Sequence, residues 1–132
     1  MTASPTPHAR AFSAYRASAQ LNTHPADVLS AVHEEMLSRL RAAKSAYEQG
    51  ALDQMCRHTD AARRILVSLD AVLDFAAAGE GGAALRRFYR RLHLAINRVL
   101  KASNVSESVQ GVIDTLQPMC VELRKRKDPV TQ

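Results

Sequence analysis

Histidines and carboxylates are the side chains of this 132-residue chain that could ligate a metal or carry catalysis. The run His33-Glu34-Glu35 resembles the start of the metalloprotease motif HExxH, but position 37 is leucine, so the second zinc-binding histidine is missing. A diiron site in a helical bundle needs a histidine three residues after a glutamate, and neither Glu34 nor Glu35 has one. The spacing argues against a metal site, and we expect no cofactor.

Nucleophile and phosphate-binding motifs are also missing from the sequence. It contains no GxSxG nucleophile elbow and no P-loop, and the glycine-rich residues 79–82 are predicted to be a linker between two helices. Met55, Cys56 and His58 are close in sequence but fall on different faces of one predicted helix, which disfavours a copper site. We therefore predict that the protein is not an enzyme.

The two cysteines, Cys56 and Cys120, form no CxxC motif, and we expect both to be small buried apolar side chains. Hydrophobic residues make up 46% of the chain and charged residues 23%, which is typical of a soluble globular domain. No apolar run could span a bilayer, and residues 1–10 lack the features of a signal peptide. We expect a single cytoplasmic domain that does not associate with a membrane.

Residues 52–78 are predicted to form the central helix of the domain. Apolar or small residues recur every three or four positions and form one continuous seam, consisting of Leu52, Met55, Thr59, Ala62, Leu66, Leu69, Leu73 and Ala76. A second row, made of Ile65, Val72 and Phe75, lies beside this seam. The two rows together are wider than one neighbouring helix would cover, so we expect the second row to contact a partner.

Three further segments show helical periodicity, and no segment alternates like a β-strand. The predicted helices span residues 26–49, 52–78, 83–103 and 106–125. Pro25 suits the first turn of the first helix, Gly50 ends that helix, and Pro118 is expected to kink the last one. Helices of this length with short connections predict an all-α fold, an antiparallel up-and-down four-helix bundle over residues 23–127.

The two ends of the chain lack helical periodicity. Residues 1–22 are rich in Ala, Ser, Thr and Pro and are predicted to form a flexible N-terminal arm, and residues 128–132 to form a frayed tail. The arm carries Phe12 and Tyr15, two of only six Phe and Tyr residues in the chain. Two interpretations stay open: these rings tether the arm to the nearest helix, or they occupy a groove that a partner later takes.

The third predicted helix is strongly basic. Its polar faces carry six cations with no acidic residue between them, namely Arg86, Arg87, Arg90, Arg91, Arg98 and Lys101. A solvated face, partly paired with Asp70, Asp74 and Glu80, is the simplest interpretation. Nucleic-acid binding is less favoured, because the two aromatic residues of this helix, Phe88 and Tyr89, fall on its core side and no nucleic-acid-binding motif occurs.

Several features occur in an order that points to one family. Tyr15 precedes Pro25 by ten residues, and the first helix ends with the phrase Ala43-Lys44-Ser45-Ala46-Tyr47-Glu48 before Gly50. The second helix carries Ala61, Ala62, Ile65, Leu66, Leu69, Leu73 and Asp74, and Gly79-Glu80 and Phe88-Tyr89 follow. From Tyr15 to about Leu116 this pattern resembles the FliS family of flagellar secretion chaperones. His33 stands where that family usually has a tyrosine.

The resemblance implies a specific function. FliS-like chaperones are cytoplasmic and bind the disordered C-terminal segment of flagellin in an apolar surface groove, which prevents premature polymerisation before type III secretion. Mapped onto this chain, the groove would comprise Ile65, Val72, Phe75 and Tyr89. Phe12 and Tyr15 of the arm would cover it when it is empty, and Arg86, Arg87, Arg90 and Arg91 would steer an acidic cargo. Other flagellar regulators or export components are further possible partners, and a helical adaptor for another protein and a basic nucleic-acid-binding bundle are the alternatives.

Overall fold

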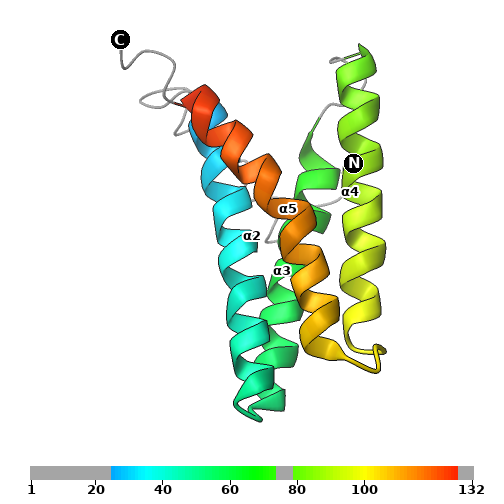
Figure 1. The fold of residues 1–132 in the computed structure, drawn as a ribbon. Helices are drawn as coiled ribbons and strands as arrows, with labels where there is room; N and C mark the ends of the chain where they lie inside the picture. The colour runs from blue at the N-terminus through cyan, green and yellow to red at the C-terminus, as the bar shows by residue number, and fades with distance from the viewer. Residues whose placement is uncertain (1–24, 74–78, 128–132) are drawn as a thin grey trace, which may run out of the picture.

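The computed structural model of the protein describes residues 25–73 and 79–127. Within these residues the chain forms four α-helices and no strand: α2 (Pro25–Glu48), α3 (Leu52–Val72), α4 (Gly79–Val99) and α5 (Val105–Lys127). The helices run alternately in opposite directions along one common axis (Figure 1). The predicted all-α, up-and-down four-helix bundle is therefore confirmed.

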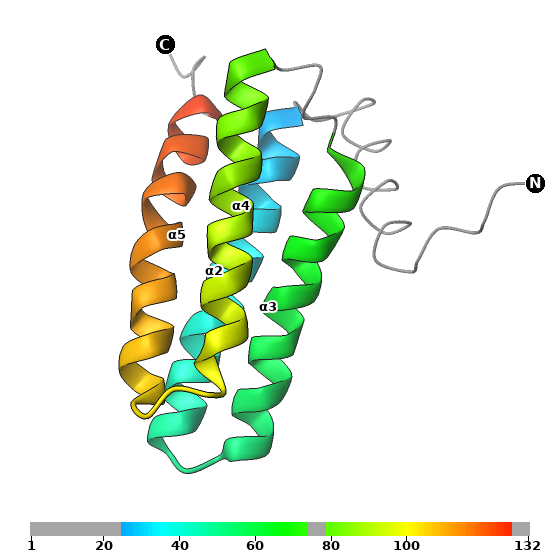
Figure 2. The ribbon, with the colours of Figure 1, turned by 90° about the vertical axis from the view of Figure 1, so that its right-hand side faces the viewer.

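The four helices are not packed equally. Helix α2 contacts α3 and α5 extensively, whereas α4 contacts the same two helices over a smaller area and lies diagonally opposite α2. Figure 2 shows this arrangement, with α4 in front, α2 behind it, and α3 and α5 on either side. The C-terminal half of α5 also leans toward α2 and away from α4 (Figure 1). Among the described residues, α4 thus makes the fewest contacts with the other helices.

All four helices contribute to one contiguous core. Its fully buried large side chains include Met36, Leu40, Leu66, Leu69, Leu92, Ile96, Val109 and Leu116. The predicted seam of the central helix is largely correct, because Met55, Thr59 and Ala62 are buried with Leu66 and Leu69. Thr59 is tolerated there since its hydroxyl donates a hydrogen bond of 2.8 Å to the Met55 carbonyl. Leu52, at the start of the seam, is 53% exposed instead.

The boundary between the second and third helices differs from the prediction. Helix α3 ends at Val72, because Leu73 has extended backbone angles, and residues 74–78 lie outside the described residues. The predicted glycine linker at 79–82 is wrong, since these residues form the first turn of α4. The first of them, Gly79, has a positive φ of 63°, a backbone conformation that glycine adopts without steric cost. Glu80 in that turn also interacts favourably with the helix dipole.

Gly50 ends α2 as the sequence predicts. It has a positive φ of 78°, its amide donates to the Tyr47 carbonyl at 3.0 Å, and the Ala51 amide donates to the Ala46 carbonyl at 2.8 Å. This pair of hydrogen bonds is the Schellman motif, which satisfies the last carbonyls of a helix. The motif turns the chain directly into α3 and so fixes the pairing of the two helices.

Gly50→Ala is expected to lower the free energy of unfolding by about 1–2 kcal/mol, since an alanine side chain is strained in the left-handed region. Nothing lies within 4 Å of a Cβ built at Gly50, so the loss would come from backbone conformation alone. Gly111→Ala in the exposed interior of α5 is the matched control, and there the substitution should stabilise by up to about 1 kcal/mol. Urea denaturation of both variants measures the difference; equal effects would contradict this interpretation.

The last two helices are joined by a capped turn. Helix α4 ends at Val99, four residues earlier than predicted, and leaves Leu100 53% exposed. Asn104 caps α5 by accepting a hydrogen bond of 3.0 Å from the Glu107 amide. Helix α5 continues through Pro118 rather than stopping before it.

Candidate partner-binding surfaces

The described part of the second apolar row of the central helix is partly exposed. Ile65 and Val72 are half-buried and pack against the core, while Phe75 lies outside the described residues. The seam beside them, by contrast, is closed at Leu66 and Leu69. Two of the three predicted second-row residues are therefore incompletely covered by the described part of the bundle.

The neighbour of this row is α2. His58, Ile65 and Val72 are spaced by seven residues and share one face of α3, and His58 lies 3.4 Å from the Arg39 guanidinium of α2. Because the two helices are antiparallel, one heptad from that contact aligns Ile65 with Val32, which is also half-buried. From this register we infer that Val32, Ile65 and Val72 share one side of the α2–α3 pair, and we call these three residues the apolar strip.

Tyr89 does not belong to this strip in the structure. It is only 2% exposed and lies on α4, the helix diagonally opposite α2. Its side chain is held in the core by a hydrogen bond of 2.9 Å between its hydroxyl and Nε2 of His33. A buried tyrosine needs a partner for its hydroxyl, and His33 provides one across the bundle. The predicted grouping of Tyr89 with Ile65 and Val72 is corrected accordingly.

His33 is a buried polar residue whose partner could not be predicted from the sequence. It is 1% exposed, and its Nδ1 lies 2.8 Å from the Leu29 carbonyl. A carbonyl only accepts, so Nδ1 carries the proton and Nε2 accepts from the Tyr89 hydroxyl. Burial lowers the pKa of His33, partly opposed by the Leu29 hydrogen bond, and burial raises the pKa of Tyr89. Both side chains are therefore neutral at physiological pH.

The arginines of α4 form the second candidate surface. Arg86, Arg87, Arg90 and Arg91 are all exposed, as are Arg98 and Lys101. They recur on the face opposite the buried residues of α4, and so point away from α2 and from the apolar strip. This position does not favour the predicted steering of cargo onto the strip, because the full width of the bundle lies between them.

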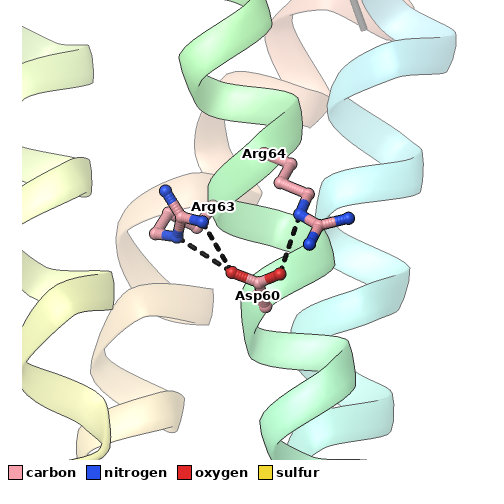
Figure 3. A network of polar contacts seen from close by, with 3 residues as sticks. All are labelled: Asp60, Arg63 and Arg64. Atoms are coloured by element: carbon pink, nitrogen blue, oxygen red, sulfur yellow. Dashed lines mark hydrogen bonds and ion pairs between the residues drawn. The ribbon is translucent and has the colours of Figure 1, made fainter. Parts of the chain in front are cut away.

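The arginines of α3 are arranged differently. Arg63 and Arg64 reach the two carboxylate oxygens of Asp60 from opposite sides (Figure 3), at 2.7 Å from Arg63 Nη2 and 2.8 Å from Arg64 Nε. The hydrogen bond from Arg63 is the main cause that holds the pKa of Asp60 below its usual value. The Asp60 carboxylate already accepts from both guanidinium groups, so it is fully occupied, and the cluster keeps one net positive charge.

Comparison with known proteins decides the family. The family described as flagellar protein FliS matches residues 8–125, which is most of the chain and all but the last residues of the bundle. The chain belongs to the FliS family. Neither the curated proteins nor the solved structures contain a match.

FliS is a chaperone family and not an enzyme family, in agreement with the expectation from the motifs. Among the described residues no group of three or more His, Cys, Asp or Glu side chains could hold a metal ion. No helix in the described ranges is long and apolar enough to cross a membrane. The FliS match therefore indicates that the functional site is a protein-binding surface rather than a catalytic centre.

The cysteines differ from each other. Cys120 is buried as expected, and burial, with the nearby Glu34 carboxylate, raises the pKa of its thiol to about 11. Cys56 is exposed, so the prediction that both are buried is wrong for this residue. It lies on the outward face of α3, one residue beyond the buried Met55. The predicted arm residues Phe12 and Tyr15 lie outside the described residues.

Proposed function

We propose that this FliS-family protein is a cytoplasmic export chaperone that binds the disordered C-terminal segment of flagellin on the apolar strip. Binding would occupy the segment that flagellin uses to polymerise and keep the subunit competent for type III secretion. The observation that carries the proposal is that Ile65, Val72 and Val32 are only half-buried while the seam beside them is closed. An amphipathic helix places its apolar face on such a strip with a repeat of three and four residues.

The free energy gained by burying the apolar strip limits how tightly the strip alone can bind cargo. Ordering a disordered segment commonly costs about 2–5 kcal/mol. Completing the burial of three half-buried aliphatic side chains returns roughly 1 kcal/mol each, half of the full-burial value. The strip therefore only offsets the ordering cost, and a stable complex requires cargo contacts beyond it. We propose that Phe75, next along the same row, extends the contact.

Phe12 and Tyr15 enter this proposal as competitors of the cargo. Both side chains are aromatic and could pack on the apolar strip. Both residues precede α2 in the sequence, and α2 forms one side of the strip. If they occupy the strip when cargo is absent, the cargo must displace them, and the apparent affinity falls by that competition.

Isothermal titration of the full chain with a synthetic C-terminal flagellin segment tests the function. We expect binding with a negative heat-capacity change and a gain of helical circular dichroism, because apolar burial and folding are coupled. A chain lacking residues 1–18 should bind more tightly if the arm competes, and unchanged affinity would remove the arm from the proposal. Absence of heat at several temperatures, with no gain of helicity, would overturn the flagellin assignment itself.

A further inference from the structure

The net charge of the protein is concentrated on α4. Residues 79–101 contain six of the 18 Lys and Arg residues and one of the 13 Asp and Glu residues. The remainder of the chain therefore has 12 basic and 12 acidic residues, and the whole formal charge of +5 belongs to this one segment. A uniformly solvated surface has no physical need for such a concentration, since like charges on one helix repel.

Four of the arginines of α4 have no carboxylate nearby in the described part of the chain. Within the described residues, no carboxylate lies at ion-pair distance from Arg87, Arg90, Arg91 or Arg98, in contrast to the Asp60 cluster on α3. Glu80 is the sole acidic residue of α4. The face thus carries guanidinium groups that are free to pair with a partner.

An apolar anchor lies in the middle of this face. Arg87, Arg91, Leu94 and Arg98 are spaced by four, three and four residues and share one side of the helix. Leu94 is 56% exposed, the highest value among the exposed large hydrophobic residues of the described chain. An apolar centre within a charged rim is the usual anatomy of a protein–protein interface.

From these observations we infer that the outer face of α4, made of Arg87, Arg90, Arg91, Leu94 and Arg98, docks an acidic segment of a second protein, separately from cargo on the apolar strip. The two surfaces lie on opposite sides of a bundle roughly two helices, about 20 Å, across. This separation exceeds the screening length of about 8 Å at physiological salt, so the arginines act little on a segment bound at the strip.

The shape of the face favours a narrow protein segment over other anions. The helices that flank α4 expose charges of both signs, with carboxylates at Asp70 on α3 and at Asp114 and Glu122 on α5, so a broad polyanion or a flat membrane would meet a surface of mixed charge beside the arginines. No exposed aromatic ring is available on described α4 for stacking of bases, because Phe88 is half-buried and Tyr89 is buried. Arginine, rather than lysine, supplies all four charges, and its planar fork matches a carboxylate.

Fluorescence anisotropy with the full chain tests this inference. The probe is a labelled helical peptide with glutamates at positions i, i+4 and i+7 around one leucine, compared with a peptide carrying glutamine in their place. We expect the acidic peptide to bind, and R87E/R91E to weaken it at least about tenfold through reversed charge. R41E/R57E makes the same change of charge at exposed positions on α2 and α3. Its affinity for the acidic peptide should stay within about twofold of that of the unmodified chain.

Two further measurements separate the inference from its alternatives. L94S should weaken the peptide severalfold without a change of charge, and R87E/R91E should leave titration with the flagellin segment unchanged. The inference is overturned if the acidic peptide does not bind, if the control variant loses as much affinity as R87E/R91E, or if L94S has no effect. Equal or tighter binding of a single-stranded DNA oligonucleotide, or of phosphatidylglycerol vesicles, would overturn it in favour of those partners.

Discussion

Val72→Asp should reduce binding of the flagellin segment at least about a hundredfold while the bundle stays folded. Val72 is half-buried on the apolar strip, so its substitution exposes little additional core. In a complex, however, the new carboxylate would be removed from water without a cation to pair with, which costs several kcal/mol. Titration calorimetry measures the affinity, and thermal unfolding followed by circular dichroism reports the fold.

The same helix offers a matched control for this variant. Val67 is 43% exposed and lies on a different face of α3 from Ile65 and Val72, so Val67→Asp adds the same charge away from the strip. It should bind the flagellin segment as the unmodified chain does. Equal loss in both variants would show that negative charge anywhere on α3 impairs binding, and a collapsed melt of Val72→Asp would assign Val72 to the core.

Tyr89→Phe is expected to lower the free energy of unfolding by about 1–3 kcal/mol, since Nε2 of His33 then stays buried without the hydroxyl that donates to it. Replacing both residues, as H33F/Y89F, removes the unsatisfied acceptor as well. The double variant should therefore lose less than the sum of the single losses, and a double-mutant cycle by urea denaturation measures the coupling. Additive losses would indicate that packing, rather than the hydrogen bond, matters at this position.

His33 also gives stability a predictable pH dependence. Its pKa is lowered in the folded protein, so the unfolded chain binds the proton more strongly. The contribution of neutral His33 to the free energy of unfolding is complete above the unfolded pKa of about 6.5. It is lost as the pH falls below that value toward the lower pKa of the folded protein. His33→Phe should flatten this acid limb of the denaturation profile, whereas His93→Gln, at a half-buried position on α4, should retain it. An unchanged limb in His33→Phe would assign it to other groups.

Helical periodicity was sufficient to predict the fold class. A repeat of three and four apolar positions identifies the buried face of each helix, and Met55, Ala62, Leu66 and Leu69 are buried as that repeat requires. Gly50 was equally predictable, because a residue with positive φ is needed to close α2. The end of α3 and the start of α4 were not, since propensity places glycine outside helices, whereas Gly79 begins α4 with a positive φ.

Pairing between helices is the information that the sequence lacked. Periodicity shows that Ile65 and Val72 share a row, but only the contact of His58 with Arg39 shows that α2 lies beside it. The same limit applies to His33 and Tyr89, which are 56 residues apart and adjacent only through the diagonal of the bundle. The one signal in the sequence was His33, a polar residue on the apolar side of the first helix, which could have indicated a buried hydrogen-bond partner.

The uneven packing of the bundle has a consequence for how it opens. Helices α2, α3 and α5 are joined through the extensive contacts of α2, whereas α4 is attached through the two smaller interfaces. Local opening requires the least free energy where the fewest contacts are broken, so excursions from the native state should begin with detachment of α4. The protein then behaves as a three-helix unit that carries a removable fourth, and that fourth helix brings with it nearly all of the net charge.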